Sequence, residues 1–183
     1  MPDDAELLSV LESLRERGAL GEASLPAAVA HADLFLAAVP PDCARLLDMG
    51  SGGGLPGLVL ASRLPNVVVV LADRRERRMD LLRLACARLG FEDRVAVVTA
   101  DVVDLARLDE YRGAFDVVTA RAFGEPMWTL ACAEPFLTER GVVIVSEPPT
   151  GDLTERWPLP TLEGLGMLPS STPFTQVKRF ERL

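Results

Sequence analysis

The chain has 183 residues and is 49% hydrophobic but only 5% aromatic, with a formal net charge of -8. This length suits one domain with a full core, and so few aromatic residues argue against a protein that works mainly by stacking on bases. An acidic chain is also a poor general binder of nucleic acid, because phosphate contacts supply most non-specific affinity, although a local basic patch is not excluded.

Two helices are predicted before the main body of the chain. Residues 3–17 place leucines on one face, as an amphipathic helix does, and the apolar stretch 25–40 predicts a second helix that ends at a Pro-Pro pair. His31, within the second helix, is interpreted as a packed residue rather than a catalyst. We expect these helices (residues 1–43) to pack on a core formed by residues 44–183, as one compact unit.

Strands and helices are predicted to alternate between residues 44 and 147. Short apolar runs predict strands at 44–50, 66–73, 94–101, 115–122 and 141–147. The intervening segments predict helices at 56–64, 75–90 and 126–137, with a short helix or turn at 101–108. This alternation is typical of a parallel sheet with crossover helices, and about five such units favour a doubly wound α/β sheet over a closed barrel. The tail is expected to add an antiparallel pair at 166–168 and 174–180, which makes seven strands.

A glycine-rich loop, GSGGGLPG (50–57), follows the first strand and precedes a helix. In an open α/β sheet ligands bind at the carboxyl ends of the strands, and glycines let the backbone approach a ligand closely. Gly52, Gly54 and Gly57 fit the G-x-G-x-x-G spacing of a dinucleotide site, with Asp73 as the acid that binds the ribose. A nicotinamide cofactor is therefore one alternative, and a helix-packing turn without a ligand is another.

Asp48 favours a different cofactor. With the glycines at 50, 52 and 54 it forms the pattern D-x-G-x-G-x-G, which is typical of sites for S-adenosylmethionine (SAM). A carboxylate at this position attracts the sulfonium and the α-amino group, directly or through water, whereas it would repel a pyrophosphate. Asp73 is the ribose acceptor in both interpretations.

Cysteine and histidine are too sparse for a zinc site. Cys43, Cys86 and Cys132 are scattered, and the chain holds one histidine, so we expect no metal and three reduced thiols. The N-terminus lacks the basic-then-apolar pattern of a signal peptide, and no apolar run approaches the roughly 20 residues of a membrane span. We therefore expect a cytoplasmic monomer with no membrane partner.

Three stretches carry a resemblance to a known family: LLDMGSGGGLPGLVLA (46–61), FDVVTARAF (115–123) and HADLFL (31–36). Over residues 28–147 the chain resembles the bacterial 16S ribosomal RNA guanine-N7 methyltransferases, the glucose-inhibited division protein B family. The resemblance implies a class I methyltransferase fold, which is Rossmann-like, with SAM as methyl donor and S-adenosylhomocysteine (SAH) as product. It also implies ribosomal RNA or the small ribosomal subunit as partner.

The loop pattern and the resemblance together give a set of candidate site residues. The candidate cofactor-binding residues are Asp48, Gly50, Ser51, Gly52, Gly54, Leu55, Asp73, Arg74, Asp101, Val102, Val103 and Arg121. In the family a Val-Glu type pair flanks the adenine, so Val102 and Val103 imply an apolar wall only, and Asp101 could reach the adenine amino group. Arg77 and Arg78 match a Lys-Arg pair and, with Arg121, are candidate substrate contacts.

These arginines also have other interpretations. For Arg121 the alternative is an ion pair with Asp116 or Asp101, and for the pair at 77 and 78 it is a solvated surface. The chain departs from the family on the RNA side, where Glu147 follows Ser146 in place of a Lys-Gly pair.

The implied reaction needs little acid–base chemistry. Guanine N7 carries a free lone pair, so no general base is required, and we assign no catalytic residue beyond in-line positioning of the reactants. Two alternatives stay open: a SAM-dependent methyltransferase with a small or cationic acceptor, and a SAM-binding module without catalysis.

Overall fold

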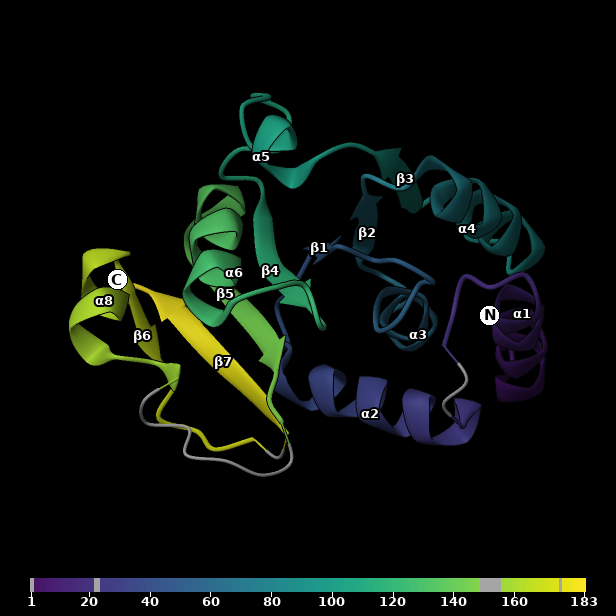
Figure 1. Ribbon diagram of the computed structural model, residues 1–183, viewed down its shortest axis with the longest axis horizontal. Helices are drawn as coiled ribbons and strands as arrows, with labels where there is room; N and C mark the ends of the chain where they lie inside the picture. The colour runs from purple at the N-terminus through teal and green to yellow at the C-terminus, as the bar shows by residue number, and fades with distance from the viewer. Residues whose placement is uncertain (1, 22–23, 149–155, 175) are drawn as a thin grey trace.

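The computed structural model describes residues 2–21, 24–148, 156–174 and 176–183. Its centre is a seven-stranded sheet of order β3-β2-β1-β4-β5-β7-β6, in which only β7 runs antiparallel to its neighbours β5 and β6 (Figure 1). The strands are β1 (Arg45–Met49), β2 (Val68–Asp73), β3 (Val95–Thr99), β4 (Phe115–Ala120), β5 (Leu137–Ser146), β6 (Met167–Pro169) and β7 (Val177–Arg182). The helices are α1 (Asp4–Glu16), α2 (Leu25–Ala38), α3 (Gly57–Arg63), α4 (Glu76–Arg88), α5 (Val102–Leu105), α6 (Pro126–Ala133), the 3-10 turn η1 (Glu134–Phe136) and α8 (Leu159–Gly164). The predicted doubly wound, mostly parallel sheet is confirmed.

Alternate residues of the strands pack on opposite helical layers. Leu46 and Val69 join the cluster formed with α1 to α4, whereas Leu47 and Val70 join the cluster formed with α5, α6 and α8. This alternation follows from the period-two geometry of a strand, and it explains why the strands read as continuous apolar runs. Figure 1 shows the two layers, with α1 to α4 on one side of the sheet and α5, α6 and α8 on the other.

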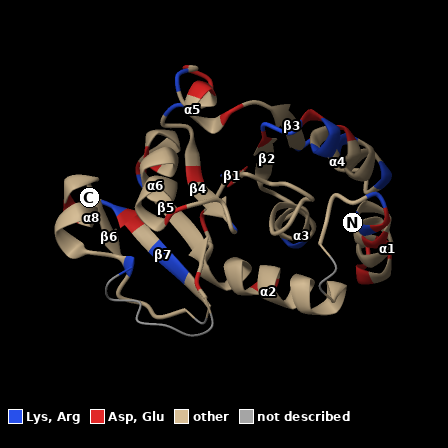
Figure 2. Ribbon diagram, in the orientation of Figure 1, with Lys and Arg blue, Asp and Glu red and all other residues tan. Residues whose placement is uncertain are grey.

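The N-terminal helices belong to the first of these layers. Asp3 caps α1 by accepting a hydrogen bond from the Glu6 N–H at 2.8 Å, and the helix buries Leu7 and Leu11 between α2 and α4. Helix α2 buries Phe35 against the sheet. Figure 2 shows that α1 is marked by acidic residues and that α4 carries both signs of charge.

Several elements differ from the sequence prediction. The predicted helix 126–137 ends at Ala133 and continues as η1, because Pro135 has no N–H for a helical hydrogen bond. Strand β5 begins at Leu137 rather than at 141, since Leu137 already pairs with Phe115 across a register shift. The tail strands lie at 167–169 and 177–182, because Gln176 turns the chain with φ +56° directly before β7. Helix α8 was not predicted, since it is short and buries only one leucine.

No described helix combines the length and the apolar character needed to cross a bilayer. Within the same described ranges, no three His, Cys, Asp or Glu side chains form a group that could hold a metal ion.

Helix α3 packs against the sheet with no room for a side chain at its first residue. A Cβ added at Gly57 would lie 2.4 Å from Leu71 Cδ2 and 2.6 Å from Asp48 Oδ2. At Gly164, in α8, an added Cβ would meet nothing within 4 Å.

We predict that Gly57→Ala lowers the free energy of unfolding by about 1–3 kcal/mol, because overpacking forces Leu71 or the buried Asp48 to move. The matched control Gly164→Ala should be neutral or slightly stabilising, because alanine is favoured over glycine in a helix. Urea unfolding midpoints of the two variants measure this difference. Equal midpoints would contradict the close packing at Gly57.

Candidate functional site

The glycine loop turns back over the carboxyl ends of β1 and β2. Gly50, Gly52 and Gly54 have φ of +73°, +54° and +91°, a region that strongly favours glycine. The N–H groups of Gly50 and Ser51 both donate to the Ala72 carbonyl, at 2.8 and 3.0 Å. The loop is therefore tied to the end of β2 by its own backbone.

Asp48 lies beneath the loop and not inside a hollow. Its side chain is buried, with Oδ1 accepting from the Thr119 hydroxyl at 2.7 Å and Oδ2 accepting from the Gly57 N–H at 3.2 Å. Burial raises the pKa of Asp48 to about 6, against the opposing effect of these hydrogen bonds and of the Arg121 charge. Its charge can thus act on a ligand only through the loop.

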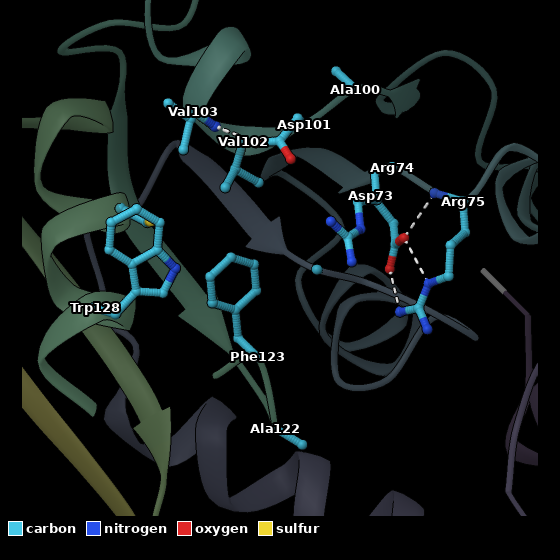
Figure 3. A pocket seen from close by; sticks show the side chains of 12 residues that line it. Asp73, Arg74, Arg75, Ala100, Asp101, Val102, Val103, Ala122, Phe123 and Trp128 are labelled. Atoms are coloured by element: carbon cyan, nitrogen blue, oxygen red, sulfur yellow. Dashed lines mark hydrogen bonds and ion pairs between the residues drawn. The ribbon is translucent and has the colours of Figure 1, made fainter. Parts of the chain in front are cut away.

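Asp73, at the end of β2, has its carboxylate fully engaged (Figure 3). Oδ1 accepts from the Arg75 backbone N–H and from Arg75 Nε, both at 2.9 Å. Oδ2 accepts from Arg75 Nη2 at 2.8 Å and from the Gly52 N–H at 3.0 Å. Burial alone would raise the pKa of Asp73, but the hydrogen bonds and charge of Arg75 hold it below its ordinary value. All four lone-pair positions of a carboxylate are filled in this way.

A hollow of about 460 Å³ opens beside Asp73, and we call it the aspartate hollow. Its lining includes Asp73, Arg74, Asp101, Val103, Phe123 and Trp128. Asp101 also caps α5, because its Oδ1 accepts from the Val103 N–H at 2.9 Å. Figure 3 shows the rings of Phe123 and Trp128 pointing into this hollow from the side opposite Asp73.

Phe123 is placed by an unusual backbone conformation. Ala122 has φ +50°, which few non-glycine residues adopt. The turn lays the Phe123 ring over Gly50, where an added Cβ would lie 2.6 Å from Phe123 Cδ2. Such strain persists only where the surroundings enforce it, and it is often found at functional sites.

A second hollow of about 350 Å³ lies on the other side of the loop, and we call it the arginine hollow. Its lining includes Arg75, Arg78, Arg121, Gly52, Leu20 and Leu25. Gly50, Arg75 and Ala122 line both hollows, so the two are neighbours across the first glycine.

Arg121 does not make the ion pairs that the sequence left open. Asp116 accepts instead from the backbone N–H groups of Ala44 and Arg45, each at 2.9 Å, and Asp101 caps α5. Burial lowers the pKa of Arg121, while the charge of Asp48 acts in the opposite direction. The pKa of His31 is lowered by burial and by the charge of Arg121, both of which disfavour its protonated form.

The structure divides the candidate residues among three places. The aspartate hollow is lined by Gly50, Asp73, Arg74, Asp101, Val102 and Val103. The arginine hollow is lined by Gly50, Ser51, Gly52, Leu55, Arg78 and Arg121. Neither lining includes Asp48, Gly54 or Arg77, and Arg77 is exposed on α4.

Sequence reasoning missed Arg75, Phe123 and Trp128. The chain offered one signal for Phe123, since this aromatic residue ends the ARAF stretch after β4. It offered none for Arg75, whose side chain reaches back two residues to Asp73.

Glu147, which follows β5, is turned into the fold. Its side chain is buried, accepts from Trp157 Nε1 at 2.9 Å and pairs with Arg156 at 3.4 Å. It therefore holds the C-terminal part of the fold together. The end of the departing stretch, residues 149–151, lies outside the described residues.

Comparisons with known proteins show the family and the fold of this chain. Residues 32–147 match the family model GidB, described as rRNA small subunit methyltransferase G. Curated relatives named ribosomal RNA small subunit methyltransferase G include one from Sorangium cellulosum, 37% identical over 56% of this chain and 42% of its own length. One from Acinetobacter baumannii is 36% identical over 54% of this chain and 46% of its own length. The chain thus spans less than half the length of these relatives.

Solved structures share the fold. A cofactor-bound protein from MTB has a TM-score of 0.73 at 21% identity, over 98% of this chain and 90% of that one. An O-methyltransferase from Bacillus cereus in complex with SAH has a TM-score of 0.70 at 19% identity, over 100% of this chain and 93% of that one. Because the family model covers more than half of the sequence, this chain belongs to the GidB family of small-subunit ribosomal RNA methyltransferases.

Proposed function

We propose that this chain is a SAM-dependent methyltransferase that modifies guanine N7 in 16S ribosomal RNA. The observation that carries the proposal is the family match over residues 32–147, which includes the glycine loop and Asp73. The aspartate hollow beside them has the size and polarity of a small-molecule site.

The residues of the two hollows suit the parts of SAM. Asp73 would accept two ribose hydroxyls in place of the Arg75 guanidinium, and Val102 and Val103 offer apolar contact for an adenine. Gly50 lines both hollows, and we expect it to contact the aminoacyl tail of SAM. When bound, SAM supplies an electrophilic methyl group.

The residues of this chain then act by binding and orientation. Guanine N7 needs no proton removed before it reacts, and both carboxylates lining the aspartate hollow already serve other hydrogen bonds: Asp73 with Arg75 and Asp101 with the Val103 N–H. Phe123 and Trp128 cover the hollow with apolar surface that displaces water. Asp48 places a negative charge behind the loop.

The charges near the loop favour an anionic acceptor. Arg74 and Arg75 line one hollow, and Arg75, Arg78 and Arg121 line the other, whereas Glu147 is buried elsewhere. This arrangement supports RNA and opposes a cationic small molecule. We place the reaction in the cytoplasm, in accord with three free thiols.

The proposal is tested by mass analysis of 16S ribosomal RNA from a strain that lacks the gene. We expect the loss of one guanine-N7 methyl group and its return when the full chain is supplied. If the methylation of the RNA were the same without the gene, and the protein consumed SAM with a fraction of small molecules, the assignment of RNA as acceptor would be wrong.

The affinity for SAM should depend on the ionisation of Asp48. Because the pKa of Asp48 is raised to about 6, the carboxylate loses its proton as the pH rises through that value, and only then attracts a sulfonium. We predict that the ratio of SAM to SAH affinity rises roughly three- to tenfold between pH 5 and pH 7.5. SAH serves as the control, because it differs from SAM only by the loss of the methyl group and, with it, of the positive charge on sulfur. Calorimetric titrations measure the affinity of both ligands at each pH. If the ratio of SAM to SAH affinity did not change with pH, Asp48 would not be the group that attracts the sulfonium.

Arg75 should compete with the ribose for Asp73. Its Nε and Nη2 donate to the two carboxylate oxygens as a fork, which is the contact that a ribose diol would make. We predict that Arg75→Met tightens adenosine binding several-fold and leaves binding of the free base adenine unchanged, as measured by calorimetry. If adenosine bound more weakly to the variant, Arg75 would instead position Asp73.

A further inference from the structure

The arginine hollow concentrates positive charge in an otherwise acidic chain. Arg75, Arg78 and Arg121 all line it, whereas the net charge of the chain is -8. A Cβ added at Gly52 would lie 3.4 Å from Arg78 Nη1 and 3.7 Å from Arg75 Nη2, so two guanidinium groups converge on the same point of the loop.

Two of these three cations have no direct counterion. Arg75 is paired with Asp73 at 2.8 Å. Among the ion pairs between described residues, none includes Arg78 or Arg121. Arg121 is also partly desolvated, because burial lowers its pKa. Holding such charges together in a hollow is unfavourable unless an anion binds there.

The position of Arg78 adds a second unfavourable contribution. Arg78 lies in the first turn of α4, where the helix dipole is positive, no side chain caps the helix, and Glu76 is the acidic residue of that turn. A bound anion would offset both the dipole and the repulsion between the guanidinium groups.

SAM does not neutralise the positive charge of the site as a whole. SAM has one carboxylate, but its sulfonium and its ammonium together outweigh it. The site therefore becomes more positive when SAM binds, and a second ligand has to carry the negative charge.

We propose that the arginine hollow binds a backbone phosphate of the acceptor RNA, held between Arg78 and Arg121. This inference rests on the proposed function and adds the group by which the acceptor is recognised. Guanidinium groups are well suited to this contact, because they bind phosphate oxygens in a bidentate manner. The phosphate would fix the nucleotide on the side of Gly50 where the two hollows meet.

The neighbouring residue Arg77 provides a matched control. It is exposed, and the lining of neither hollow includes it. Arg77→Met and Arg78→Met remove the same charge from adjacent positions of one helix, so they separate a defined phosphate contact from the general charge of the surface.

The experiment measures binding of purified 16S ribosomal RNA, from a strain that lacks the enzyme, to the full chain with SAH at several salt concentrations. Arg78→Met should weaken binding roughly tenfold and reduce the slope of log affinity against log salt by about 0.7 to 1. Arg77→Met should keep the slope of the unmodified chain. Equal effects of the two variants would overturn the proposal.

A second measurement identifies the anion. We expect guanosine 5′-monophosphate to bind more tightly than guanosine, and Arg78→Met to abolish this difference while SAH affinity stays unchanged. If Arg78→Met instead weakens SAH but not 5′-methylthioadenosine, which lacks the aminoacyl tail, the hollow holds the carboxylate of the cofactor and the proposal fails. Because these titrations need no methyl transfer, they stay informative even if the chain proves inactive on ribosomal RNA.

Discussion

Two buried carboxylates hold the glycine loop, and the rest of the site depends on them. Asp48 accepts from the Gly57 N–H below the loop, and Asp73 accepts from the Gly52 N–H beside it. A loop with five glycines in eight residues has little side-chain packing of its own and much conformational freedom to lose. Fixing its two ends to β1 and β2 sets the start of α3 and separates the two hollows.

The fold was predictable because its signals are local and repeated. Alternating apolar strands and helices predicted the parallel sheet. The parallel sheet in turn brings Gly50, Asp73 and Asp101 to one edge, since they lie at or just beyond the carboxyl ends of neighbouring strands. The boundaries of some elements were predicted less well. Pro135 divides one predicted helix, and the turn at Gln176 makes β7 begin later in the sequence than predicted.

The side-chain arrangement of the site was less predictable than its location. Phe123 reaches Gly50 only because Ala122 adopts φ +50°, and alanine is not a residue type that signals this conformation. The contact of Arg75 with Asp73 is similar, because the direction of a long exposed side chain is set by its surroundings rather than by sequence spacing. Glu147 is the opposite case. Its place in the sequence pointed to a role toward the substrate, but its carboxylate accepts a hydrogen bond from Trp157 inside the fold.

The two tryptophans of the chain lie in very different surroundings. Trp128 is 56% exposed at the rim of the aspartate hollow, whereas Trp157 is buried, bonded to Glu147 and packed 4.6 Å from the Phe180 ring. Their intrinsic fluorescence is consequently separable: the emission of Trp128 lies at longer wavelength and is accessible to a dissolved quencher, and that of Trp157 is shielded. The chain therefore carries one natural optical probe for occupancy of the hollow and another for the packing of its C-terminal strands.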